Sequence, residues 1–108
     1  NFIVKGNGSY ILAQYPFEGE EVKESQKIFI YLSDKEKNEI IVPELKGMTI
    51  LEAGKLLEQM GLIIKVNGSG YAESQLPSPD TVLKKDSIVQ VYFSNKNEGR
   101  IENDKTQS

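Results

Sequence analysis

The chain has 108 residues, a mass of 12.1 kDa and a formal net charge of −3, with 38% hydrophobic residues and neither cysteine nor histidine. This length suits one domain or two very small ones, and the missing residue types exclude Ser-His-Asp and Cys-His catalysis, the usual zinc sites and a disulfide framework. The acidic balance, with Arg100 as the sole arginine, argues against a nucleic-acid surface.

The chain starts at Asn1 with neither an initiator methionine nor a signal peptide, and it has no apolar run long enough to cross a membrane. We therefore expect an internal piece of a longer protein, with any membrane anchor outside it.

An internal repeat organises the sequence. Residues 2–33 align with residues 62–94 when Gly70 is treated as a single insertion, and eleven of the 32 positions in the first segment are identical. The aligned pairs include Phe2 with Leu62, Tyr10 with Tyr71 and Gln14 with Gln75. Each copy therefore adopts the same local structure in our prediction.

The first copy, residues 1–33, predicts three strands. Phe2 and Val4 alternate with other residues, as in a half-buried strand, and Asn7-Gly8 is typical of a hairpin turn. Ile28, Ile30 and Leu32 then mark the face of a last strand.

Residues 34–40 form a charged linker, the expected domain boundary. After a short extended lead, Thr49 and Glu52 fit a capping box at the start of a helix, and Gly61 suits its end. The apolar residues of the expected helix share one face. This helix opens a complete domain over residues 41–94.

The second copy repeats the strand pattern. Asn67-Gly68 again indicates a hairpin, residues 71–75 a return strand that Pro77 ends, and residues 88–94 a final strand. The fold class we predict is α+β, with a small three-stranded antiparallel sheet packed by one helix, preceded by an incomplete repeat without its helix. Residues 95–108 are expected to be a disordered tail.

The first copy has no helix of its own to cover its apolar face. Three explanations stay open: the helix lies outside this piece, the complete repeat covers the face, or a partner chain does, which includes a self-associated dimer.

The ordered motifs of residues 41–94 resemble a PASTA domain. They comprise Val42-Pro43-Glu44-Leu45-Lys46-Gly47-Met48-Thr49, then Gly68-Ser69-Gly70-Tyr71, and then Ser74-Gln75-Leu76-Pro77-Ser78-Pro79. Residues 2–33 resemble the closing half of a preceding PASTA repeat. Asp80 and Asp86 stand where the family usually has glycine, and aspartate tolerates left-handed backbone better than most residues.

The resemblance implies a non-catalytic, extracytoplasmic cell-wall module of a membrane-anchored bacterial protein. The implied parent is a class B penicillin-binding transpeptidase, similar to stage V sporulation protein D, and the implied ligands are peptidoglycan stem peptide, muropeptide or β-lactam. The alternatives are a structural spacer or protein–protein docking module, which could contact the transpeptidase domain, and the sensor of a PASTA Ser/Thr kinase. No cofactor or metal is expected.

Both copies keep a Tyr-x-x-x-Gln spacing on one predicted strand. Residues two apart on a strand face the same side, so Tyr71, Glu73 and Gln75 are expected to line one surface, as are Tyr10 and Gln14. An aromatic ring beside an amide and a carboxylate suits a sugar–peptide fragment. The alternative, which we weigh more heavily, is that the tyrosines pack across the hairpin and the glutamines bond neighbouring turns.

Overall fold

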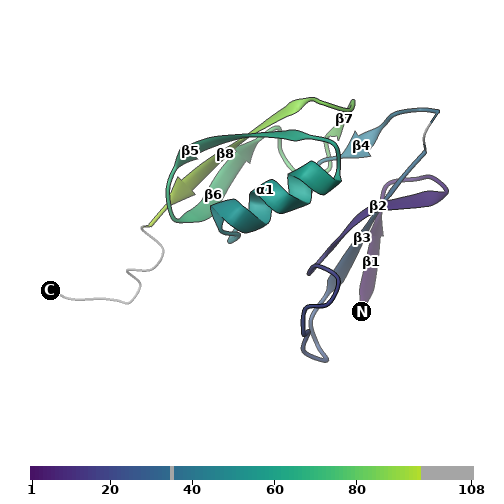
Figure 1. Cartoon of the computed structure of the whole chain (residues 1–108), viewed down its shortest axis with the longest axis horizontal. Coiled ribbons are helices and arrows are strands. Elements are labelled where there is room, and N and C mark those ends of the chain that lie inside the picture. The colour runs from purple at the N-terminus through teal and green to yellow at the C-terminus, as the bar shows by residue number, and fades with distance from the viewer. Residues whose placement is uncertain (35, 96–108) are drawn as a thin grey trace, which may run out of the picture.

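The computed structural model describes residues 1–34 and 36–95. The tail predicted from residue 95 therefore lies, from residue 96 on, outside the described residues. Within them the chain forms one helix and eight strands (Figure 1): β1 Phe2–Lys5, β2 Tyr10–Tyr15, β3 Ile28–Ser33, β4 Ile40–Ile41, α1 Ile50–Gln59, β5 Ile63–Gly68, β6 Tyr71–Leu76, β7 Val82–Leu83 and β8 Ile88–Ser94. The predicted α+β class with one helix and three-stranded sheets is confirmed.

The two copies build sheets of the same topology. The strand order is β1-β3-β2 in the first sheet and β5-β8-β6 in the second. In each sheet the first strand runs parallel to the central strand and the other outer strand runs antiparallel to it. A two-stranded sheet of β4 and β7 adds to the second copy.

The sequence predicted an antiparallel sheet built on a hairpin, and this prediction was wrong about which strands pair and in which direction. Strands β5 and β6 are consecutive in sequence but do not pair, because β8 lies between them. The turn after Asn67 must cross the end of β8, where a Cβ on Gly68 would meet the backbone carbonyl of Phe93. Gly68 is therefore required for a close approach to the β8 backbone, and not for a two-residue hairpin.

Helix α1 begins and ends as the sequence predicts. The Thr49 hydroxyl accepts from the Glu52 backbone N–H at 3.2 Å, and the Glu52 carboxylate accepts from the Thr49 backbone N–H at 3.0 Å, which completes the capping box. Gly61 follows with a φ of 81°. The helix buries Ala53, Leu56 and Leu57 completely.

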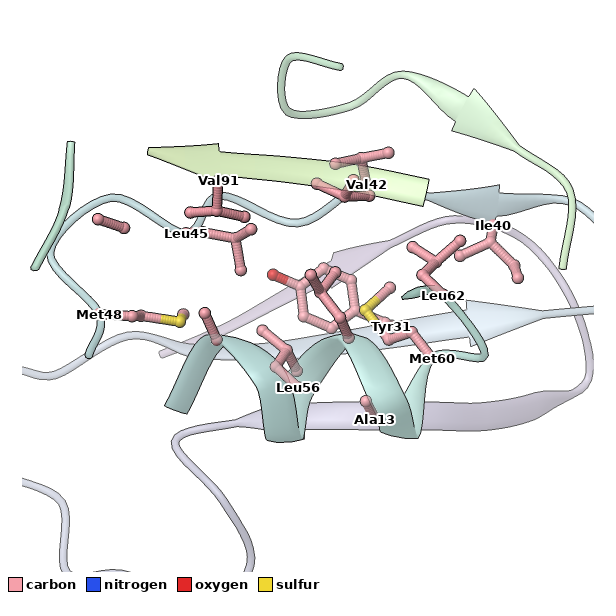
Figure 2. Close-up of a cluster of buried hydrophobic side chains, with 14 of the residues drawn as sticks. Ala13, Tyr31, Ile40, Val42, Leu45, Met48, Leu56, Met60, Leu62 and Val91 are labelled. Atoms are coloured by element: carbon pink, nitrogen blue, oxygen red, sulfur yellow. The ribbon is translucent and has the colours of Figure 1, made fainter. Parts of the chain in front are cut away.

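Helix α1 lies between the two three-stranded sheets (Figure 1) and contacts β5 and β6 on one side and β2 on the other. Both sheets contribute to a single hydrophobic core. Figure 2 shows Leu56 of α1, and Met60 directly after the helix, among side chains from both copies, including Tyr31 and Val91.

The first sheet turns only one of its faces toward this core. The paired residues Ala13 and Tyr31, and beside them Tyr15 and Phe29, lie on the covered face. The other face, here called the open face, consists of Phe2, Val4, Ile11, Ile28, Ile30 and Leu32. The complete repeat thus covers the face of the first sheet that carries Tyr31. The sequence had left three explanations for what covers the open face, and the complete repeat does not cover it.

Candidate functional site

The residues proposed from the sequence do not share one surface. A register shift between Ala72 and Ser74 places Tyr71 opposite Ser94 but Gln75 opposite Val91. Because residues of β8 alternate between faces, Tyr71 and Gln75 lie on opposite faces of the sheet. The bulge defeats the two-residue period on which the one-surface expectation depended.

The first copy repeats this bulge. Its register shift lies between Ile11 and Ala13, so that Tyr10 pairs with Ser33 and Gln14 with Ile30. Glu73, between the two shifted pairs of the second copy, is exposed, and Tyr71 is 41% exposed.

The Gln75 side chain bonds backbone groups within the chain. Its Oε1 accepts from the Leu45 N–H at 3.0 Å, and its Nε2 donates to the carbonyls of Pro43 and Pro77, each at 3.1 Å. These bonds fasten the segment before α1 to β6. The geometry favours the structural reading of Gln75 over ligand contact.

Tyr10 lies at a different kind of place, a cleft where the two copies meet. This junction cleft has a volume of about 240 Å³ and is lined by Tyr10 and Leu12 of β2, Ser33 and Asp34 at the end of β3, Asn38, Ile40 of β4, Glu58, Gln59, Met60 and Gly61 at the end of α1, and Lys85. Of these lining residues, only Tyr10 was proposed from the sequence as a ligand-binding residue.

The junction cleft combines buried apolar residues with exposed charges. Ile40 and Met60 are buried, whereas Glu58 and Lys85 are exposed. The buried Ser33 hydroxyl donates to the Glu39 carbonyl at 3.2 Å and holds the linker against the first sheet. A hollow of about 120 Å³ that also includes Asp34 lies on the linker.

Sequence reasoning missed Asp34, Glu58 and Lys85 as site residues. They come from the linker, the helix end and the turn before β8, so no spacing relates them. Residues 34–40 were interpreted only as a boundary. The fold that brings the copies together makes this segment a wall of the cleft.

The ionisable groups most altered by their surroundings lie in the core between the copies. Burial raises the pKa of Tyr31 to about 12, and the carboxylates of Asp80 and Glu44 contribute. Burial also raises the pKa of Tyr15, helped by Glu52 and Glu20. Both phenols are neutral at physiological pH and serve packing.

Aromatic contacts join the first copy to α1. The ring of Phe17 contacts Tyr15 edge-on, with centroids 5.2 Å apart, and Lys55 Nζ lies 4.3 Å from the Phe17 centroid. Phe17 is 5% exposed.

Across residues 1–34 and 36–95, no cluster of three acidic side chains is placed to hold a metal ion. The same residues contain no helix of the length and hydrophobicity needed to span a membrane.

Solved structures of other proteins are similar to this one. Penicillin Binding Protein 2X from Streptococcus thermophilus is similar in structure, with a TM-score of 0.54 and 21% identity over 87% of this chain and 14% of that one. The extracellular region of the Ser/Thr kinase PrkC from Staphylococcus aureus matches with a TM-score of 0.44 and 19% identity over 87% of this chain and 37% of that one. The three-PASTA-domain of a Ser/Thr kinase from the same organism gives 0.44 and 21%, over 86% and 52%.

The present chain thus spans well under two thirds of each of these proteins. No curated protein matches it significantly. The PASTA domain family matches residues 40–95, more than half of the sequence, and these residues include β4, α1 and the whole second sheet. The chain belongs to the PASTA domain family, whose members are non-catalytic binding modules.

Proposed function

We propose that this chain is an extracytoplasmic cell-wall module of a class B penicillin-binding transpeptidase, similar to stage V sporulation protein D, and that it binds uncrosslinked peptidoglycan stem peptide. The junction cleft carries this proposal, because it combines an apolar interior with charges of both signs. A stem peptide offers alanine methyl groups, a terminal carboxylate and a side-chain amine.

The chemistry of the cleft matches these groups one by one. The Lys85 ammonium pairs with the ligand's carboxylate, and Asp34 and Glu58 pair with its amine. The methyl groups contact the half-buried side chains of Tyr10 and Leu12, which line the cleft. The proposed binding site thus includes Tyr10. Tyr71 and Glu73, which are exposed on the second sheet, form a second candidate binding site to test.

Such a site binds weakly by itself. A cleft of about 240 Å³ is smaller than the sites that enclose drug-sized ligands. Tethering compensates, since a module linked to a catalytic domain holds that domain at an effective concentration of up to about millimolar near the wall.

An NMR titration of the full 108-residue chain with defined muropeptides tests the proposal. We expect saturable shifts of the amides around Tyr10, Asp34 and Lys85. Lys85→Ala should weaken binding about tenfold, the size of one charge-assisted hydrogen bond, while Lys65→Ala, which removes an exposed lysine of β5 outside the cleft, should leave it unchanged.

Flat spectra at millimolar muropeptide would contradict binding to the cleft. Saturable shifts confined to Tyr71 and Glu73 would place the binding site on the second sheet instead. A parallel titration with a β-lactam distinguishes that ligand, which the family resemblance also implies.

A spacer or docking module is the second candidate function. The observation that favours it is the shared core, in which Ala13, Phe17 and Tyr31 of the first copy pack with the buried residues of the complete repeat. This packing makes the tandem rigid enough to hold a neighbouring domain at a fixed distance. A PASTA kinase as the parent would use the same module as a sensor.

A further inference from the structure

The dipeptide Asn-Gly occurs twice in the chain, as Asn7-Gly8 and Asn67-Gly68, and each pair is followed by serine. Asparagine is a chemically labile residue, and it is most reactive when glycine follows it. The backbone nitrogen of the glycine attacks the side-chain carbonyl carbon of the asparagine, and glycine has no side chain to hinder this approach. By sequence alone, the two pairs should react alike.

The fold does not place the two pairs at equivalent positions. In the first sheet Phe2 pairs with Ile28, whereas in the second sheet Ile64 pairs with Val89, which aligns with Ile28. Strand β1 is therefore shifted by two residues relative to the sequence alignment. This shift carries Asn7 beyond the end of its strand.

Asn7 lies at the tip of an exposed turn, where the second copy has Ser69. In both copies the turn has the pattern Gly-x-Gly and crosses the end of the central strand. The flanking Gly6 and Gly8 have φ angles of 84° and 144°. Asn7 and Gly8 are exposed, and within the part of the chain that the structure describes the Gly8 N–H makes no hydrogen bond. Nothing therefore holds the attacking nitrogen away from the side-chain carbonyl.

Asn67 has the opposite surroundings. It lies within β5, where Asn67 pairs with Tyr92 and Gly68 with Phe93. The Nδ2 atom of Asn67 is buried, without a hydrogen-bond partner among residues 1–34 and 36–95. The reaction here requires the end of β5 to leave the sheet, and its product would bury a carboxylate in place of the amide.

We propose that Asn7 is a site of spontaneous covalent modification, which converts to aspartate and isoaspartate while Asn67 stays intact. The Gly8 nitrogen bonds to the side-chain carbonyl carbon of Asn7, and the side-chain nitrogen leaves with the Gly8 amide proton as ammonia. Water then opens the resulting succinimide ring. Opening at the side-chain carbonyl leaves aspartate, and opening at the backbone carbonyl leaves isoaspartate, so that one water is consumed for each ammonia released.

The modification adds negative charge at the junction between the copies. Asn7 lines the hollow of about 120 Å³ on the linker, together with Asp34, Lys37 and Glu39 of the linker and Ile41 of the second copy. A carboxylate at Asn7 joins two others around a single lysine. Like charges this close repel each other, so the new charge disfavours the packed position of the linker.

Isoaspartate also changes the backbone, because its main chain runs through one additional carbon atom. The turn has no space for this atom, since even a Cβ on Gly8 would collide with the Ser33 carbonyl. The Ser33 hydroxyl in turn holds the linker by donating to the Glu39 carbonyl at 3.2 Å. The packing of the two copies therefore loosens as the protein ages, whichever ligand the junction cleft binds.

Storage of the full chain at mildly alkaline pH tests the proposal. Peptide mapping by mass spectrometry, with separation of aspartate from isoaspartate, follows both asparagines. In the folded chain Asn7 should convert at least about tenfold faster than Asn67, because Asn67 reacts only after local opening of β5. In urea the two should convert at nearly equal rates, since both lie in the sequence Asn-Gly-Ser.

Asn7→Ser is the matched control, because Ser69 occupies the corresponding position of the second copy. This variant should keep its NMR spectrum and urea midpoint on storage, whereas the unaltered chain should show new amide signals at Asp34 and Ile41 and a lower midpoint. Equal rates in the folded chain, or an intact Asn7 after both asparagines have converted in urea, would overturn the assignment of the site. Conversion of Asn7 with unchanged Asp34 and Ile41 signals would overturn its effect on the junction.

Discussion

Two glutamines with the same sequence surroundings have different structural roles in this chain. The sequence identified Gln14 and Gln75 as matching positions, and it favoured bonding to a neighbouring turn over ligand contact. For Gln75, three bonds to backbone groups favour the same reading. The bonded partners Pro43 and Leu45 lie more than 29 residues away, so no local pattern could have named them.

At this scale we predict unequal costs for the same substitution. Gln75→Ala removes three hydrogen bonds and should lower the free energy of unfolding by about 3 kcal/mol, whereas Gln14→Ala removes one and should cost about 1 kcal/mol. Urea unfolding monitored by circular dichroism measures both. Equal losses would show that the bonds to Pro43 and Leu45 contribute nothing.

The helix and the strands differ in how much the sequence revealed of them. The capping box and Gly61 gave both ends of α1, because these signals act through neighbouring residues. Strand positions also followed from local alternation. Strand order did not, since the parallel pairing of β5 with β8 joins residues 25 positions apart, such as Ile63 and Ile88, and the Asn-Gly pair suits a hairpin equally well.

The capping box provides the prediction for the helix. Thr49→Ala removes the hydroxyl that accepts from the Glu52 N–H and should cost about 1 kcal/mol, visible as a lower midpoint of thermal unfolding. Thr49→Ser keeps the hydroxyl and is the matched control. If serine lost as much as alanine, packing of the threonine methyl group would be the cause, and not the cap.

For the molecule as a whole, the main finding is that two copies share one core around α1. The sequence predicted that the first copy lacks a helix but could not tell which face the complete repeat would cover. Both faces of β3 are apolar, with Phe29 and Tyr31 on one and Ile28, Ile30 and Leu32 on the other. Only the fold shows that the aromatic face packs inward. The junction cleft results from this packing, and its residues could not be found from either copy alone.

The buried Tyr31 makes the stability of the packing between the two copies depend on pH. Its pKa is about 12 in the folded chain against 10.0 for a free tyrosine, so the unfolded state loses the proton first as pH rises. The folded state then binds more protons, and stability falls between pH 10 and pH 12. Urea midpoints measured across this range should decrease less in Tyr31→Phe than in the unaltered chain.

Tyr92→Phe is the control for this measurement, because Tyr92 aligns with Tyr31 but is 39% exposed. Because this variant keeps Tyr31, its urea midpoint should decrease between pH 10 and pH 12 as that of the unaltered chain does. An identical decrease in Tyr31→Phe would mean that Tyr31 is not buried between the copies in solution.

The position of β3 and β8 at the centre of their sheets has a consequence for synthesis on the ribosome. In each copy the central strand is the last of the three to be made. The two outer strands do not pair with each other, so neither sheet can close until its final segment has left the exit tunnel. Each copy therefore folds in one late step, and a nascent chain that stops before Ile88 holds α1 with no sheet of its own to cover.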